Sequence, residues 1–314
     1  IVSQMYSQGT CTNGWDVVFN MGLSEINMVL KKQYETLKKD TTYKNTINVD
    51  TSEKYPGNVT VINKFKIDYG YPLLNFSVNN ANSATLDLEI LEGTVQRCSQ
   101  VGDGPVNCDT PETLKGETLT AVISLAKVAG EITVENSQHK VLRVELDMKQ
   151  GAFSISNIKL SDETKIEFNA AVKAYFVENP VIFLINQLDI TGIPTLEALR
   201  PNNFIFKPLE TPSKNKMLQL FIMTGNRALL NYSQAFLNNI PEPLPIDQTT
   251  SMMIRSELIF NEVLPQSLQK NGWALAGVNP GNGKAWSGKF TNASVTGTVD
   301  LSPLNHSQSS GGQG

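Results

Sequence analysis

Cysteine and histidine are both scarce in this chain of 314 residues, which has three cysteines and two histidines. An odd, sparse set of cysteines does not build a disulfide scaffold. A catalytic triad, a Cys–His pair or a histidine-based metal site needs a positioned imidazole. His306 lies near the end of the chain, and we expect His139 to lie in a solvated turn. We therefore expect no enzymatic activity, no metal site and no cofactor.

Two of the cysteines flank a strong turn signal. Cys98 and Cys108 lie on either side of Gly102-Asp103-Gly104-Pro105, so they can face each other across a hairpin and form a disulfide. The alternative is a pair of ordinary buried thiols. The sequence leaves both readings open.

A basic excess is also missing, because the formal net charge is -4. Nucleic-acid-binding proteins usually carry a positive surface, so we expect no nucleic-acid partner. Lysine pairs do occur, at Lys31-Lys32 and at Lys38-Lys39. They fit a solvated helix face or, alternatively, a surface that docks on an anionic membrane.

No apolar run approaches the roughly 20 residues of a transmembrane helix. The longest, Val181 to Ile185, has the length of a strand. No basic segment followed by an apolar one resembles a secretory leader. We expect a protein that is secreted or released without a visible signal peptide, or one that stays in the cytoplasm.

What the chain does have is enough apolar character for an ordered core, with 40% apolar and 18% charged residues. Apolar residues at three- and four-residue steps predict a long amphipathic helix from Thr12 or Asn13 to about Lys39. The polar segment from Asp40 to Ser52 is expected to be a loop.

Alternating apolar residues then predict an antiparallel meander with one wet face. Gly70 and Pro72 are expected to separate its first two strands. The expected strand segments are 59–69, 74–78, 86–90, 119–125, 132–134, 142–148 and 153–155.

The pattern changes at Ser161. Ser161 or Asp162 is expected to cap a helix that ends at Asn179-Pro180. Strands are expected at 181–190, 203–207 and 217–224, and one or two more at 290–301. A second long helix is predicted from Ser251 to about Gln269, which Pro265 should kink or end.

The predicted organisation is one elongated domain over residues 1–306. It can divide into two lobes, at about 1–160 and 161–306, and a disordered tail follows at 307–314.

Without a catalytic set, the apolar stripes of the two long helices are the main candidate feature. They are either ordinary core or the lining of a groove for an apolar ligand such as a lipid. The candidate lipid-binding residues are Trp15, Phe19, Leu23, Ile26, Leu30, Ile254, Leu258 and Phe260.

Four segments, in the same order along most of the chain, resemble proteins encoded beside clostridial neurotoxins. The first is Asn13-Gly14-Trp15-Asp16-Val17-Val18-Phe19. It resembles the opening of the OrfX proteins and of the forty-seven-kilodalton protein. The other three segments are 174–186, 218–227 and 256–265.

This resemblance implies the tubular lipid-binding (TULIP) fold, an α+β architecture in which highly curved antiparallel sheet wraps long amphipathic helices. It implies a bacterial protein that binds lipid and that accompanies toxins or acts with insecticidal activity, with no catalytic residues to carry over. The implied partners are a lipid or membrane surface and other toxin-cluster proteins. The alternative is an accessory subunit of a toxin complex whose core is closed.

Overall fold

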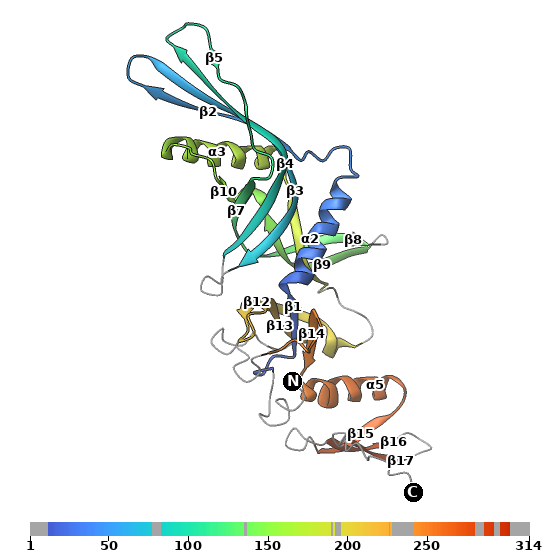
Figure 1. The fold of residues 1–314 in the computed structure, drawn as a ribbon. Coiled ribbons are helices and arrows are strands. Elements are labelled where there is room, and N and C mark those ends of the chain that lie inside the picture. Colours follow the sequence, from blue (N-terminus) through green and yellow to red (C-terminus); the bar gives the residue numbers. More distant parts are fainter. Residues whose placement is uncertain are drawn as a thin grey trace.

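The computed structural model describes residues 12–76, 83–134, 137–189, 191, 196–225, 227, 242–279, 286–291 and 296–301. The described part is elongated (Figure 1). A curled sheet with two helices forms one end and extends into a two-armed projection. A smaller sheet lies below it, followed by a helical segment and a three-stranded sheet.

The curled part combines two antiparallel sheets, which together we call the half-barrel. The larger sheet has the order β10-β7-β4-β3-β2, with β5 and β6 also on β4, and the smaller has the order β11-β9-β8. The strands of the larger sheet are β2 (Thr46–Tyr55), β3 (Val59–Phe76), β4 (Ser83–Val101), β5 (Asn107–Cys108), β6 (Glu112–Thr113), β7 (Thr118–Ser124) and β10 (Ala152–Ile155). Those of the smaller sheet are β8 (Ala126–Val134), β9 (Ser137–Asp147) and β11 (Ile182–Asp189).

The predicted antiparallel meander is confirmed, but its strands are longer than expected. Strand β3 is continuous, with buried and exposed side chains in alternation. The expected break at Gly70 and Pro72 appears instead as shifts in the β3–β4 register on both sides of Tyr69. A bulge accommodates an irregular residue while the strand continues. The prediction of a loop from Asp40 to Ser52 is wrong in its second part, because strand β2 begins at Thr46.

We call the projection the finger. It consists of β2, the first half of β3, the second half of β4 and β5 (Figure 1). Cys98 of β4 pairs directly with Cys108 of β5, and the two form a disulfide. Of the two readings that the sequence left open, the bridged one is therefore correct.

Helix α3 (Asp162–Glu178) is confirmed together with its cap, since Ser161 Oγ accepts a hydrogen bond from Thr164 N at 3.0 Å. The hydroxyls of Ser161 and Thr164 donate to the carboxylate of Glu53 on β2, as does Tyr55 Oη. These bonds hold the pKa of Glu53 down at about 2. Glu53 is therefore ionised at neutral pH and ties the start of α3 to the finger.

The prediction of a first long helix, from Thr12 or Asn13 to about Lys39, is wrong in its first part. Residues Val17–Gly22 form strand β1, and helix α2 spans only Leu23–Leu37. Strand β1 is a central strand of a four-stranded sheet, which we call the base, of order β12-β13-β1-β14. Its apolar run fits a buried strand as well as a helix, and pairing on both edges decides for the strand. The other base strands are β12 (Pro201–Glu210), β13 (Lys216–Thr224) and β14 (Thr250–Ile254).

The prediction of a second long helix is also wrong at its start, because the residues from Thr250 to Ile254 form strand β14. The helical segment consists of α4 (Ser256–Leu258), a π-helical turn at Ile259–Val263 and α5 (Leu264–Lys270). Pro265 does not end it, since the wider π-helical turn lies just before the proline. The pair of long amphipathic helices expected from the sequence is therefore not observed. Helices α2 and α3 have 15 and 17 residues.

Short 3-10 turns and a terminal sheet complete the described elements. They are η1 (Met148–Gln150), η2 (Glu197–Leu199), β15 (Ala274–Asn279), β16 (Trp286–Thr291) and β17 (Thr296–Leu301). The last predicted alternation is confirmed as β16 and β17, whereas the expected tail lies outside the described residues. None of the described helices combines the length and the apolar character needed to cross a membrane.

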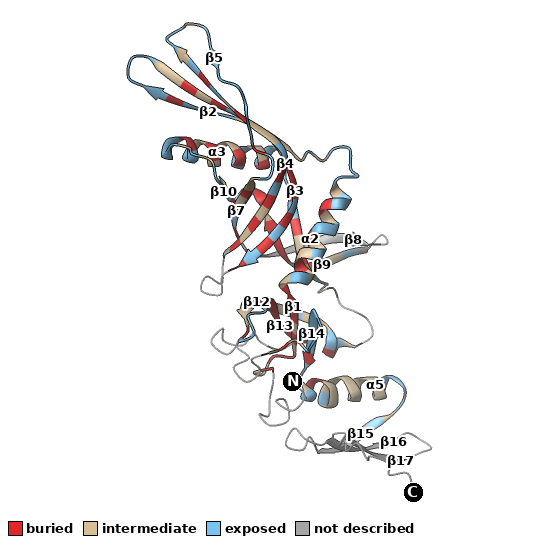
Figure 2. Ribbon diagram, in the orientation of Figure 1, coloured by how far each residue is buried: buried red, intermediate tan, exposed pale blue. Residues whose placement is uncertain are grey.

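Among the described residues, most buried apolar side chains belong to one of two clusters. The larger fills the half-barrel between its strands, α2 and α3, and the smaller lies in the base (Figure 2). The larger cluster includes residues of β13, so the base packs against the same interior.

Candidate functional site

Helix α2 lies along a sheet edge that no described strand covers. Strand β2 pairs with β3 from Val59 to Asp68, whereas β3 continues to Phe76. Backbone groups on such an edge need other hydrogen-bond partners. Asn27 of α2 supplies them, because its Oδ1 accepts from Leu74 N at 2.7 Å and its Nδ2 donates to Leu74 O at 3.2 Å.

The opposite flank of α2 covers a second edge in the same way. Strand β11 is the last strand of the smaller sheet, and its pairing with β9 is irregular just after Leu184. Gln33 Oε1 accepts from Leu184 N at 2.9 Å, and Gln33 Nε2 donates to Leu184 O at 2.5 Å. Helix α2 thus spans the gap between β3 and β11, which closes the half-barrel along one side.

The buried face of α2 lies between these two amides. Successive helical residues are rotated by about 100°, so Asn27 and Gln33 lie about 120° apart around the axis with Leu30 midway. Ile26 and Leu30 are fully buried and Tyr34 nearly so. We call these three residues the inner stripe. They face the half-barrel interior while the two amides bond to its edges.

An aromatic cluster lies beside the inner stripe. Tyr34 Oη donates to Tyr69 O at 2.8 Å, and Tyr43 Oη donates to Tyr69 Oη at 3.2 Å. Phe176 stacks on Phe153 at 5.3 Å between ring centroids and lies 6.0 Å from Tyr69. Burial raises the pKa of Tyr69, and it raises the pKa of Tyr43 to about 12. These phenols stay neutral and pair with one another, so the cluster presents an apolar wall to the interior.

Four of the eight candidate lipid-binding residues lie in or against this interior. Ile26 and Leu30 are fully buried in the larger cluster, and the partly buried Leu23 and Phe19 pack against it. Phe19 does so from strand β1 rather than from the helix to which the sequence assigned it.

The other four lie elsewhere. Trp15 belongs to the smaller cluster, with its ring 5.8 Å from that of Phe221. Leu258 is fully buried, Phe260 is half-buried in the π-helical turn, and Ile254 is 37% exposed on β14. The structure therefore divides the candidate set among the half-barrel, the base and the helical segment.

A buried carboxylate organises the base. Asp16 is fully buried, and its Oδ2 accepts from the backbone N and the hydroxyl of Thr224 at 2.9 and 3.1 Å. Its Oδ1 lies 2.9 Å from Arg255 Nη2 and also pairs with Arg227 Nη1. Arg227 Nη2 bonds Glu262 at 3.0 Å. Asp16 thus connects the start of β1 to the end of β13. The two arginines that bind Asp16 also pair with acidic residues of the helical segment, Arg227 with Glu262 and Arg255 with Glu257.

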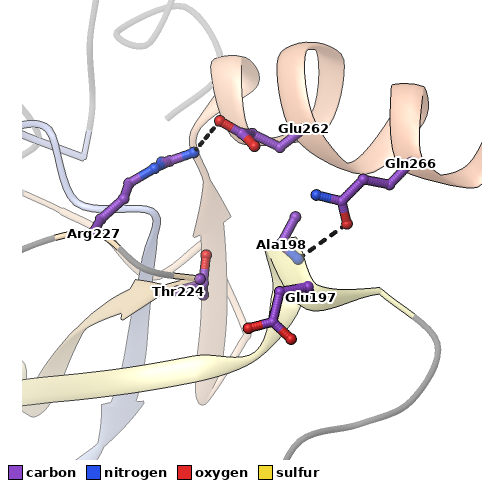
Figure 3. Close-up of a pocket in the computed structure, with 7 residues that line it drawn as sticks. Glu197, Ala198, Thr224, Arg227, Glu262 and Gln266 are labelled. Atoms are coloured by element: carbon purple, nitrogen blue, oxygen red, sulfur yellow. Dashed lines mark hydrogen bonds and ion pairs between the residues drawn. The ribbon is translucent and has the colours of Figure 1, made fainter.

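A polar cavity of about 280 Å³ lies beside this network (Figure 3). It is lined by Glu197, Ala198, Thr224, Gly225, Arg227, Glu262 and Gln266. The charged groups already have protein partners, since Glu197 pairs with Arg200 at 3.3 Å and Arg227 with Glu262. Gln266 Oε1 accepts from Ala198 N at 3.2 Å. We interpret this cavity as part of the joint between helical segment and base, and it differs in chemistry from an acyl-chain site.

His139 lies in strand β9, so the expectation of a solvated turn is wrong. Its Nδ1 pairs with the carboxylate of Asp189 on β11, and its side chain is 27% exposed. Thr191 N donates to the other oxygen of that carboxylate at 2.8 Å. Within the described part of the chain, no group of three or more His, Cys, Asp or Glu side chains is arranged to hold a metal ion.

Sequence reasoning missed Asn27 and Gln33. Both are polar residues on an amphipathic helix, and the pattern alone assigns such residues to solvent. Arg227 was noted only within a motif, and Asp16 was assigned to the first predicted helix without a structural role. A signal existed for Asp16, because it lies between the apolar Trp15 and Val17 at the start of what proved to be a buried strand.

Comparisons with known proteins bear on the fold. No protein-family model and no curated protein matches this chain. Among solved structures, P47 from Clostridium botulinum A2 aligns with a TM-score of 0.53 and 15% identity, over 95% of this chain and 68% of that one. The chain has a P47-like fold. P47 of Clostridium botulinum E1 gives the same TM-score and identity, over 92% of this chain and 67% of that one.

P47 is the forty-seven-kilodalton protein named above. The resemblance to it that the sequence motifs indicated is therefore confirmed at the level of fold. A lipopolysaccharide-binding protein also aligns, over 91% of this chain and 76% of that one. Its TM-score is 0.25 and its identity 11%, and we draw no argument from it. The P47-like architecture seen here is α+β, with a curled antiparallel half-barrel and few helices.

Proposed function

We propose that this protein is a non-enzymatic binding protein that takes up the acyl chain of a lipid inside the half-barrel, between α2 and the sheet. The supporting observation is that α2 closes the half-barrel between two sheet edges through side-chain amides. A helix held in this way can separate from the edges without unpairing any strand. The inner stripe of the helix, formed by Ile26, Leu30 and Tyr34, would then contact the ligand instead of the sheet.

The chemistry of the interior supports an apolar ligand. The strand residues buried there are mostly aliphatic, as in Leu74, Leu86, Leu88 and Ile90. Each methylene group moved from water to such a surface is stabilised by about 0.8 kcal/mol. In the structure this interior is occupied by the protein's own side chains. Ligand uptake therefore requires α2 to move outward by the depth of an acyl chain.

The similarity to P47 of Clostridium botulinum supports a toxin-associated context for the proposal. The protein would be bacterial and toxin-associated, released or secreted, and insecticidal in the organism that it reaches. Its partners would be a lipid or membrane surface and other proteins of the toxin cluster, with no nucleic acid. The bilayer would supply the ligand.

Vesicle incubation followed by native mass spectrometry tests the proposal. We expect the protein, repurified from phosphatidylcholine vesicles, to carry added mass equal to one or a few whole lipids, and denaturing conditions should remove it. The matched control is Leu73→Asn, which removes an apolar side chain that is 46% exposed on the outer face of β3. This variant should take up the same amount, because the proposed ligand lies inside.

A second function, an accessory subunit of a toxin complex with a closed core, is favoured by a different observation. Strand β14 is the last strand of the base sheet and exposes Met252 by 61%, next to the buried Met253. Ile246, just before it, is 90% exposed. Exposed apolar residues at a sheet edge are typical of protein interfaces. Folded protein that gains no lipid mass at a large vesicle excess contradicts lipid binding and favours this function.

A further inference from the structure

The amides of Asn27 and Gln33 imitate neighbouring strands. In an antiparallel sheet, one residue accepts from a partner's N–H and donates to the same partner's C=O. Each amide does this with one edge residue, Asn27 with Leu74 and Gln33 with Leu184. Carboxamides suit this because they carry an acceptor and two donors on one group. Helix α2 is thereby bonded to both sheets without being a strand of either.

We propose that Asn27 and Gln33 are a two-sided latch that controls how fast an apolar ligand reaches the half-barrel interior. This inference rests on the proposed function for the identity of the ligand. The latch bonds are polar and only partly buried, so water can replace them when α2 lifts. The buried bond of Tyr34 Oη to Tyr69 O must also break, and the apolar contacts of Ile26 and Leu30 can be replaced only by an apolar ligand. Opening without ligand is therefore unfavourable, and opening beside a lipid is not.

The attachments at the two ends of α2 are consistent with such a movement. At its start, Gly22 N donates to Thr249 O at 2.7 Å, which anchors the helix to the base. At its end, the chain after Leu37 forms turns before β2 begins at Thr46. On the outward face of α2, Met28 is 57% exposed. The helix therefore has a fixed start and a free outer side toward which it can move.

A purely structural role for the amides is the competing interpretation, because proteins often cap open sheet edges. The two roles differ in what they control. A capping role only pairs the backbone groups of Leu74 and Leu184, so its loss leaves the rate at which α2 opens unchanged. A latch also sets the rate of lipid uptake, while the amount bound at saturation stays the same because the interior is unchanged.

The test uses full-length protein with Asn27→Ala or Gln33→Ala, and Gln33→Glu as a conservative variant that keeps the acceptor but loses the donor. The matched control is Lys32→Ala, on the exposed side of the same helix. The first readout is hydrogen–deuterium exchange of the Leu74 and Leu184 backbone amides without lipid. Losing one amide should speed exchange at its edge residue about tenfold, because two hydrogen bonds of ordinary net strength are removed. Gln33→Glu should fall between wild type and Gln33→Ala at Leu184.

The second readout is the rate at which phosphatidylcholine from vesicles appears as added mass in native spectra. We expect both alanine variants to load several times faster than wild type and Lys32→Ala, to the same final amount. Unchanged loading rates, with wild-type protein still loading, would overturn the latch and leave the proposed function standing. No loading by wild type or by any variant, with exchange accelerated, would overturn the proposed function. Exchange at Leu74 and Leu184 unaffected by the substitutions would overturn the latch directly.

Discussion

Replacing Asp16 with alanine is expected to lower the free energy of unfolding by about 3 kcal/mol. Removing one partner of a buried ion pair typically costs about 3–5 kcal/mol, since it leaves charges without compensation. Asp16 is fully buried, while Arg227 and Arg255 keep 27% and 23% of their side chains exposed. The two arginines can therefore turn partly toward water, which places the expected loss at the lower end of that range.

The backbone of the base should also respond to this substitution. Thr224 N donates to Asp16 Oδ2 in the native protein, and alanine removes that acceptor at the end of β13. Asp16→Asn keeps an oxygen at the same position but loses the charge, so it should destabilise less than alanine. Urea unfolding followed by circular dichroism measures both variants.

The matched control for Asp16 is Glu257→Ala. Glu257 is exposed and its carboxylate lies 4.0 Å from Arg255 Nε, a surface pair for which little energy is expected. Its substitution should change the unfolding free energy by less than about 0.5 kcal/mol. If Asp16→Ala unfolds with the same midpoint as Glu257→Ala, the buried network does not hold the base together.

The second large effect is expected for Phe176→Ala, at about 3–5 kcal/mol, the usual cost of deleting a buried aromatic ring. Phe176 is fully buried on α3. Its ring contacts those of Phe153 on β10 and Tyr69 on β3. The substitution opens a cavity where the helix meets both strands, so α3 should detach from the half-barrel before the finger unfolds.

Val177→Ala is the control for Phe176, because the neighbouring side chain is 60% exposed on the same helix turn. It should leave the denaturation midpoint almost unchanged. Hydrogen exchange of α3 amides distinguishes local detachment from global unfolding. Equal stability of the two variants would mean that α3 is not packed into the half-barrel as described.

The parts of the fold that followed from sequence are those fixed by local pattern. Strict alternation predicted the strands of the half-barrel, and Ser161 or Asp162 as a helix cap predicted the start of α3. Strands β1 and β14 were assigned to helices because their apolar runs fit either structure. Strand β1 is a strand because it pairs with β13, which lies about 200 residues away along the chain, and β14 is one because it pairs with the other edge of β1.

The candidate site was predictable only in part, for the same physical reason. Ile26 and Leu30 follow from the helical period, since an apolar stripe must be buried against something. The roles of Asn27 and Gln33 depend on where β2 stops pairing with β3 and on β11 being an edge strand. Both facts belong to the three-dimensional arrangement and leave no mark in the sequence around α2.

The measurement that tests lipid binding inside the half-barrel most directly is photo-crosslinking from within the bilayer. Vesicles would contain a phosphatidylcholine with a diazirine at the middle of one acyl chain, and irradiated protein would be digested and mapped by mass spectrometry. We predict adducts on Ile26 and Leu30 of α2 and on strand residues that share their core, such as Leu86 and Leu88. Adducts confined to outward-facing residues such as Met28 and Leu73, with none in the interior, would contradict it.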